Sequence, residues 1–576
     1  MIYFTNMKIL HKIFTVLLIS VALGACTSDF EEENINPNLI VAEDASAKFF
    51  LTEAMLRPYL PNRFAYWRGN LIHADRYGGH FTFGHSRCWW SDGLGYQFNG
   101  GYTDATWGHF NGYLPTIKQV LDFTAPGGQF ENELTHAVAL IIKSHYYQLY
   151  TDTFGEIPYS DLFKEGIDLP KFDTQKEIYQ GIIADLNTAM ATIGDETSTG
   201  NVNEDLGSND IIYGGDLQKW KRFANTLKLK VAMRANGAPD NDFSEAAIQE
   251  ALGQPLLMEG ESAVIEKDLE ISQWQYATYG DIWYNFGDGS NWTVGRELVN
   301  FLRDNNDPRL EKYTQPSLGG DFTLQRPSAS DDAEGYDLFP KRTAFIREVL
   351  DEAGAVYTWT ELEADGTETI EITMPEEENY VGQPVRLNGR MAGLAQYGFF
   401  SRPSEAVIQR KNQGGAATPE TVLLSSDAFF LQAEAAVRGL TSGDAQALYQ
   451  TGIRESMRLW EVSDGSIEEY IATQDMAMLN GSMEENLRKI AMQRWAAHYT
   501  DGYEAWAIVR DTGYPASLAN GVDDYEIYDP GTIEQGDYPQ RLRYGSNLQA
   551  SNPSGFETAL SRQGDNVQGT TLWWAE

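Results

Sequence analysis

The chain has 576 residues, of which 42% are hydrophobic and 22% charged, so it can bury a large core without staples. The formal net charge of −40 repels phosphate backbones, which argues against nucleic acid as a partner. Two cysteines cannot form a disulfide framework. The 14 Trp and 30 Tyr residues fill part of the core, and their rings also suit stacking on a flat ligand.

The N-terminal stretch has the order of a secretory signal. Starting at Met7, a weakly basic region precedes the apolar run "IFTVLLISVALGA", which is too short to span a bilayer, and Cys26 follows. "LGAC" resembles the lipobox of bacterial lipoproteins, which implies that residues 1–25 are removed and that Cys26 is acylated, for example with palmitate. An ordinary cleavage site followed by a free cysteine is the alternative.

Residues 26–44 contain "SDFEEENINPN", which is polar and acidic and contains proline. Such a composition predicts an extended tether between the lipid anchor and a folded domain. The acidic run also looks like the pattern that accompanies export of some lipoproteins to the cell surface. A solvated spacer and an export signal both stay open as interpretations.

Most of the chain from about residue 45 has the hydrophobic period of amphipathic helices. Thr174 and Glu177 form a capping-box pair, and Asp216 is a candidate N-cap. Late in the chain, two helical runs joined by "GLTSGD" predict a tetratricopeptide-like hairpin. The clearest helical patterns cover residues 131–152, 174–190, 215–235, 425–440 and 442–460. The tryptophans that we assign to core or scaffold are Trp107, Trp220, Trp495 and Trp506.

The middle of the chain is different, because from about residue 262 to 403 it shows little helical period. "VYTWTELEADGTETIEITM" alternates on both sides of Asp365-Gly366, which predicts a β-hairpin. We therefore predict a predominantly all-α fold, an array of tetratricopeptide-like helical pairs with a loop-rich insertion that contains this hairpin. A single domain would span residues 45–576. It would comprise a helical scaffold over about 45–261 and 404–515, the insertion over about 262–403, and a C-terminal tail over 516–576.

Several stretches along nearly the whole chain resemble one family. They are "NINPN", "YTDTFGEIPYSDLF", "IIYGGDLQKWKRFANTLKLKVAMR", "FFLQAEAAVRG", "IAMQRWAAHYTDGYEAWAIVRDTGYP", "YPQRLRY" and "TLWW". They resemble the SusD/RagB family of nutrient-binding outer-membrane lipoproteins, in particular the SusD-like branch with an "NxNPN" start. The region from about residue 321 to 403 does not align to the family pattern.

The resemblance implies a helical array with a loop-rich face and a role in capturing an oligomeric nutrient, often a glycan, at the outer surface of the cell. It implies a partner, a SusC/RagA-like TonB-dependent outer-membrane transporter, and it implies no catalysis. The protein would be anchored in the outer membrane through the lipid on Cys26 and face the cell exterior. A peptide-binding import lipoprotein of the same architecture is the alternative.

Two glycine-rich stretches without helical period combine aromatic rings with polar side chains, as binding of a sugar ring and its hydroxyls requires. They are "HSRCWWSDGLGYQFNGGY" and "WQYATYGDIWYNFGDGSNW". For each ring, burial in the core is the alternative interpretation. The candidate ligand-binding residues are Trp89, Trp90, Tyr96, Trp274, Tyr276, Tyr279, Trp283, Tyr284, Trp292, Asp281, Asn285 and Asn291.

Other chemistries have little support in the sequence. The cluster of His73, His80, His85 and Cys88 offers zinc-ligand types, but its spacing matches no zinc motif, so we predict no metal site and no cofactor. "FGDGSN" lacks the ligand pattern of an EF-hand, although a calcium ion in the acidic loops stays open. A surface glycoside hydrolase would need paired carboxylates, which 83 acidic residues supply by chance, and nucleophile-elbow and phosphate-loop motifs are missing. We therefore expect no enzyme activity; an adhesive surface protein is a further alternative.

Overall fold

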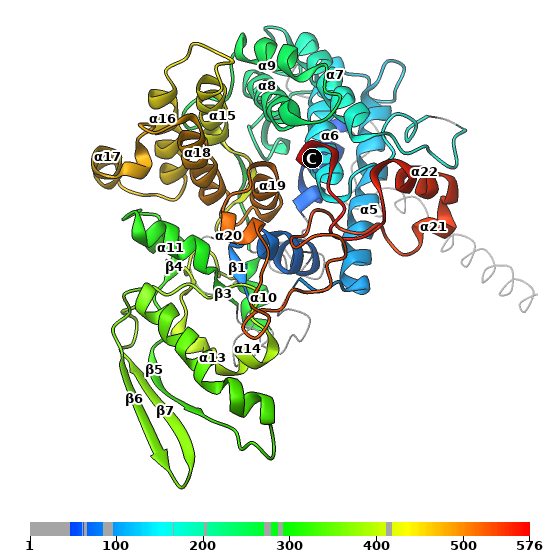
Figure 1. Cartoon of the computed structure of the whole chain (residues 1–576). Helices are drawn as coiled ribbons and strands as arrows, with labels where there is room; N and C mark the ends of the chain where they lie inside the picture. Colours follow the sequence, from blue (N-terminus) through cyan, green and yellow to red (C-terminus); the bar gives the residue numbers. More distant parts are fainter. Residues whose placement is uncertain are drawn as a thin grey trace, which may run out of the picture.

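The computed structural model describes residues 46–59, 62, 66–83, 96–164, 166–200, 204–269, 278–285, 292–410 and 417–576. The described chain is predominantly helical, which confirms the predicted fold class. Helices from both halves of the chain pack into a rounded body, and a smaller lobe with a β-hairpin projects from it (Figure 1).

The first half of the chain supplies one side of the helical body. Glu177 donates its backbone N–H to the Thr174 hydroxyl at 3.2 Å and accepts the Thr174 N–H at 2.8 Å, so the predicted capping box is confirmed. Asp216 accepts the N–H of Lys219 at 3.0 Å and caps the next helix. The helices of this half are α3 (Ala47–Leu56), η1 (Arg57–Tyr59), η2 (Trp67–Asp75), α5 (Gly100–Thr124), α6 (Glu133–Phe154), α7 (Gln175–Ile193), η4 (Gly207–Asn209), α8 (Leu217–Arg234), η5 (Ala235–Gly237) and α9 (Ser244–Leu252).

Helices α15 to α18 supply the other side of the body, where α15 and α16 form the predicted hairpin of paired helices. The last helices, α21 and α22, return to the side of the first half (Figure 1). The four tryptophans assigned to the scaffold are all buried, which confirms that assignment. The helices of this part are α15 (Ser425–Val437), α16 (Ala445–Leu459), α17 (Asp464–Thr473), η9 (Asp475–Ala477), α18 (Met483–Ala497), α19 (Gly502–Thr512), α20 (Ala516–Ala519), α21 (Leu548–Ser551), α22 (Pro553–Gln563) and η10 (Trp573–Ala575).

Short strand pairs attach the middle of the chain to the body. β1 (Phe81–Thr82) pairs with β3 (Thr293–Val294), and β2 (Ala263–Ile265) pairs with β9 (Glu420–Leu423), both antiparallel. A third antiparallel pair lies within the middle segment. The remaining elements of this region are α10 (Tyr279–Asn285), α11 (Arg296–Asp304), α12 (Leu310–Tyr313), β4 (Thr314–Gln315), β5 (Gly320–Gln325), α13 (Ala333–Glu352), β6 (Thr358–Ala364), β7 (Thr367–Met374), α14 (Gly389–Leu394), η8 (Tyr397–Phe399) and β8 (Arg402–Pro403).

The predicted β-hairpin is confirmed as β6 and β7, and β5 joins it to form an antiparallel sheet with the order β5-β7-β6. Asp365 and Gly366 both have positive φ, at 55° and 77°, as the turn between two tightly connected strands requires. The hairpin points away from the body (Figure 1).

The middle segment is more ordered than its sequence indicates, because α13 runs for 20 residues. Two features obscure its period. Pro340 lies in the helix interior, and the buried face includes Arg342 and Thr343 besides apolar residues such as Ile346 and Leu350. This face packs on the sheet and forms a core separate from that of the body. We call α13 and the three-stranded sheet the lobe.

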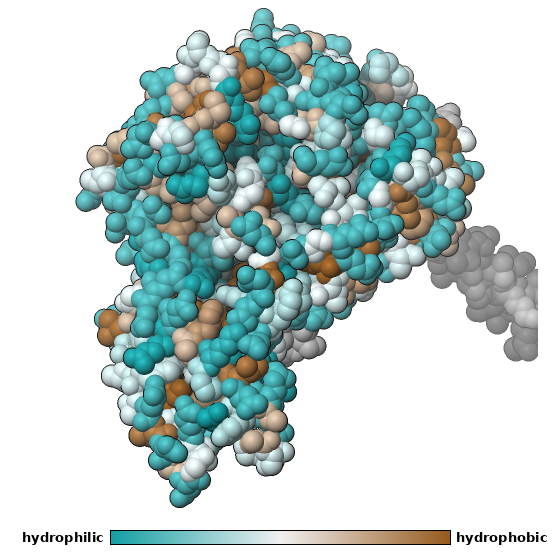
Figure 2. Space-filling view, in the orientation of Figure 1, coloured by the Kyte–Doolittle hydropathy of each residue, from teal (hydrophilic) through white to brown (hydrophobic). Residues whose placement is uncertain are grey.

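On the face shown in Figure 2, the surface is mainly hydrophilic with scattered apolar patches, as a net charge of −40 leads one to expect. Within the described ranges, none of the helices has the length and apolarity needed to cross a membrane.

The contact between α15 and α16 generates a stability prediction. A Cβ atom on Gly452 of α16 would lie 2.6 Å from the Phe430 ring of α15, and that ring is fully buried. We expect Gly452→Ala to lower the free energy of unfolding by about 1–3 kcal/mol, because the helices must move apart. Urea denaturation measures this value. Gly465→Ala in α17 is the control, since its nearest neighbouring atom lies at 4.0 Å, and it should cause no loss. Equal stability of the Gly452 variant and the unmodified protein would contradict the prediction.

Candidate functional site

The two stretches with predicted ligand-binding residues begin or end at one place in the fold. In the β1–β3 pair, Phe81 lies opposite Val294 and Thr82 opposite Thr293. Phe83, which precedes residues 84–95, therefore lies near Trp292, which follows residues 286–291. Gln383 holds this junction, since its side-chain amide donates to the Phe83 carbonyl and accepts the Thr293 hydroxyl.

Helix α10 joins the same region. A Cβ atom on Gly280 would lie 2.2 Å from the Gln409 carbonyl oxygen, so only glycine allows α10 to approach residues 408–409 this closely. The Arg410 guanidinium lies 3.9 Å from the centre of the Tyr284 ring, which α10 carries. The described ends of segments 84–95, 286–291 and 411–416 are thus joined through β1–β3 and α10.

Four of the candidate rings form the base of this region instead of its surface. Trp292 is 0% exposed and meets Trp283 edge to face at 5.1 Å between ring centres. The Tyr279 hydroxyl donates to Asp75 Oδ2 at 2.7 Å. Tyr96 is also buried, with Arg386 at 4.5 Å above its ring. In this arrangement none of these four rings offers an open face, because each completes the main hydrophobic core.

Tyr284 is the described candidate ring with an open surface, at 37% exposed. Asp281, one turn earlier on α10, is mostly buried, and its N–H donates to the Thr278 hydroxyl at 3.0 Å. The other candidates lie outside the described residues or, for Asn285, have no described side chain: Trp89, Trp90, Trp274, Tyr276, Asn285 and Asn291. Residues 286–291, which were considered for calcium, also lie outside the described residues.

The histidines considered for zinc pack as core residues where the structure describes them. His80 Nε2 lies 3.1 Å from the Trp495 carbonyl oxygen, and its ring packs against Trp495 and Tyr499. Burial lowers the pKa of both His73 and His80 to about 3, so both rings are neutral. His85 and Cys88 lie outside the described residues.

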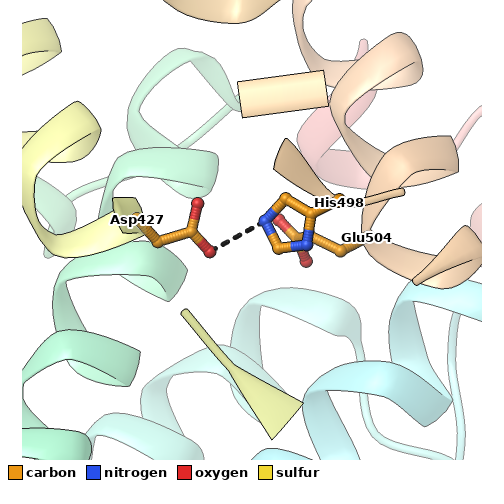
Figure 3. A group of neighbouring side chains, drawn as sticks. All are labelled: Asp427, His498 and Glu504. Atoms are coloured by element: carbon orange, nitrogen blue, oxygen red, sulfur yellow. Dashed lines mark hydrogen bonds and ion pairs between the residues drawn. The ribbon is translucent and has the colours of Figure 1, made fainter. Parts of the chain in front are cut away.

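One group in the described part of the chain has metal-ligand types within reach of a common point: Asp427 of α15, His498 after α18 and Glu504 of α19 (Figure 3). His498 bonds Asp427 Oδ2 through Nε2 at 3.0 Å and Asp501 Oδ2 through Nδ1 at 2.9 Å. Glu504 pairs with Arg234 and lies 3.2 Å from Lys230 Nζ. Both ring nitrogens of His498 and the Glu504 carboxylate are therefore already engaged.

Charges around this group decide its chemistry. Burial alone would lower the pKa of His498, but the attraction of Asp427 and hydrogen bonds to Asp427 and Asp501 raise it to about 10. Burial alone would raise the pKa of Glu504, but Arg234 and Lys230 outweigh it and hold that pKa well below its usual range. A protonated imidazole cannot ligate a metal. The group fits a buried ion-pair network that joins helices.

The described chain is a helical array with a projecting lobe, and its described candidate residues lie around β1–β3 and α10. Residues 80–325 and 371–545 match the SusD-like family whose model is described as "Starch-binding associating with outer membrane". Because the match covers most of the chain, this protein belongs to the SusD-like family. The stretch between the two matched ranges, residues 326–370, contains α13 and β6 of the lobe. The prediction that residues 321–403 do not align to the family pattern was wrong for residues 371–403, which match.

Solved structures share this fold. A chitin-binding SusD homologue from Flavobacterium johnsoniae has a TM-score of 0.68 at 21% identity, over 92% of this chain and 98% of that one. A SusD-like protein from Bacteroides thetaiotaomicron has a TM-score of 0.65 at 23% identity, over 92% and 98%. A further chitin-binding protein has a TM-score of 0.67 at 22% identity, over 92% and 99%. Comparison with curated proteins gave no significant match.

Sequence patterns did not single out Gln383 or Arg410, although both contact the region. Neither belongs to an aromatic-rich stretch, and Gln383 acts through a pairing of strands that are distant in the sequence. Arg410 is linked to the region only by its contact with Tyr284, which the folded chain creates.

The pKa of His498 generates a pH prediction. Since this pKa is about 10 in the fold and 6.5 for an unperturbed side chain, protonation of His498 stabilises the fold fully below pH 6.5, and the contribution is lost as the pH rises toward 10. We expect the difference in unfolding free energy between the unmodified protein and His498→Gln to shrink over that range. Denaturant titrations at several pH values measure it.

The control for this prediction is His136→Gln. Burial lowers the pKa of His136 below 6.5, so its effect on stability should change only in more acidic solution. A difference for His498→Gln that stays constant from about pH 6 to pH 10 would contradict the prediction.

Proposed function

We propose that this protein is a nutrient-capture lipoprotein of the outer surface, which binds an oligosaccharide and delivers it to a TonB-dependent outer-membrane transporter. The observation that carries the proposal is the SusD-like family match over residues 80–325 and 371–545, whose description combines starch binding with the outer membrane. Binding without turnover is expected, so the protein would act as a capture component and not as an enzyme.

Two observations support a glycan as the ligand. Two structures of the same fold are described as chitin-binding, and chitin is a glycan. Tyr284, in the second of the aromatic-rich stretches, has an exposed side chain, with the Arg410 guanidinium over its ring. A ring face beside polar side chains suits the C–H face and hydroxyl rim of a sugar. Peptides are the second candidate, and a glycan and peptide array separates the two classes.

Anchoring through Cys26 completes the proposal, since multiple acyl chains hold a protein stably at a membrane. We expect Cys26→Ser to move the protein from the membrane fraction to the soluble fraction of the cell, while the isolated protein keeps its ligand affinity. Immunoblots of separated fractions measure the distribution. Cys88→Ser is the matched control and should remain with the membrane; release of both variants or of neither would refute the assignment.

The ligand region is tested by Trp90→Ala and Tyr284→Ala. Each should weaken binding of the saccharide identified on the array by about tenfold, because a stacked ring is lost. Tyr525→Ala is the control, as Tyr525 is 62% exposed and lies outside this region. Isothermal titration calorimetry measures the affinities. Unchanged affinity of both variants would remove the assignment of this region.

A further inference from the structure

Two large clefts among the described residues lie outside the α10 region. The cations of one cleft bind other groups of the protein, whereas the other cleft holds an arginine without such a partner. The cleft between α7, α8 and α9 has a volume of about 770 Å³. Its cations are engaged by the scaffold: Lys221 donates to the Gly194 carbonyl at 2.6 Å, and Lys228 binds Glu250 at 2.7 Å. These side chains stabilise the packing of the helices, so few of their hydrogen-bonding groups remain for a ligand.

The second cleft, which we call the junction cleft, has a volume of about 600 Å³. It is lined by α11, α18, residues 384–386 and the segment 515–528, and Glu352 at the end of α13 adds a residue of the lobe. Of the predicted ligand-binding residues that the structure describes, none lines it. Ligand sites commonly form at such meetings of structural units, and the volume is in the range of small-molecule pockets.

The floor of the junction cleft is apolar. Phe301 of α11, Val385, Met476 and Met492 line it, and Met492 lies on α18. Such side chains suit the C–H face of a sugar ring, and methionine adapts to an irregular ligand surface. The floor alone does not select a charged or neutral ligand.

Arg488 on α18 favours a negatively charged ligand. Of the arginines that line the cleft, Arg296 pairs with Glu352, and Arg386 donates to the Pro530 and Asp537 carbonyls at 2.7 and 2.9 Å. In the described part of the chain, Arg488 has no ion pair or hydrogen bond, although it is half-buried.

Two acidic groups on which Arg488 acts through space, Asp475 and Glu485, are engaged elsewhere. Asp475 binds Lys489 at 2.8 Å, and Glu485 accepts the Ser482 N–H at 2.7 Å. In a chain with a net charge of −40, a guanidinium that faces a cleft without a carboxylate in contact is an available anion-binding group.

Hydrogen-bonding groups for hydroxyls lie in the same cleft. Tyr528 lines the cleft, and its hydroxyl makes no hydrogen bond to another described residue. Asp523 lies exposed nearby in the same lining. An acceptor and a hydroxyl of this kind pair with the rim of a sugar.

We propose that the junction cleft binds a carboxylate-bearing sugar, a hexuronate unit, with Arg488 on its carboxylate, Asp523 and Tyr528 on its hydroxyls, and the apolar lining residues beneath its ring. A planar guanidinium matches a carboxylate with two parallel hydrogen bonds, which a neutral sugar cannot form. The proposed function concerns a different region, so this site makes a separate claim about which saccharides the protein recognises.

Calorimetry with digalacturonate and diglucuronate tests the proposal on the purified protein. We expect at least one of them to bind with a Kd of about 1 mM or tighter, and the neutral digalactose to bind at least about tenfold more weakly. Arg488→Gln should weaken uronate binding by about tenfold or more, while Arg488→Lys should lose less because it keeps the charge.

Arg347→Gln is the matched control, because it removes the same charge from an arginine of α13 that is 51% exposed and outside the cleft. Its uronate affinity should be unchanged, as should that of Tyr284→Ala, which separates this site from the α10 region. Thermal unfolding verifies that each variant is folded. Absence of uronate binding, equal binding of digalactose, or equal losses in the Arg488 and Arg347 variants would each overturn the proposal.

Discussion

The helical body depends on a set of charges that its own folding removes from water. Arg234 of α8 binds Asp152 of α6 at 2.5 Å and also Glu504 of α19, while Arg494 of α18 lies 3.6 Å from Asp427 of α15. A buried charge without a partner costs several kcal/mol, so each of these helices can occupy only the position that satisfies the others. Helices from both ends of the chain are thereby held in one mutual arrangement.

This fixed arrangement of helices explains in which part of the chain the sequence can vary. The family match covers the helices that carry the buried charges, and it is interrupted over α13 and β6, which belong to a lobe with its own core. Because the lobe core is separate, its sequence can change without disturbing the charge network. The junction cleft adjoins the lobe through Glu352, at the end of α13, and its other lining residues belong to the ranges that match the family.

Local patterns predicted the elements whose physics is local. The Thr174–Glu177 capping box and the Asp365-Gly366 turn depend on residues a few positions apart, and both are present. Helix α13 escaped prediction because Pro340 and buried polar residues diluted its apolar period. For the ligand region, sequence could nominate aromatic-rich stretches, but it could not separate rings that close the core from rings that remain open.

The sequence by itself determined the helical class, the hairpin and the family, since these rest on spacing and composition, and it predicts a lipid anchor at Cys26. Only the tertiary structure decided that Trp292 is buried while Tyr284, eight positions earlier, is exposed. The β1–β3 pairing and the contact with Trp283 enclose the Trp292 ring, whereas the Tyr284 ring keeps exposed surface beside the Arg410 guanidinium. The same holds for Arg488: whether a guanidinium is paired depends on which carboxylates the fold places beside it.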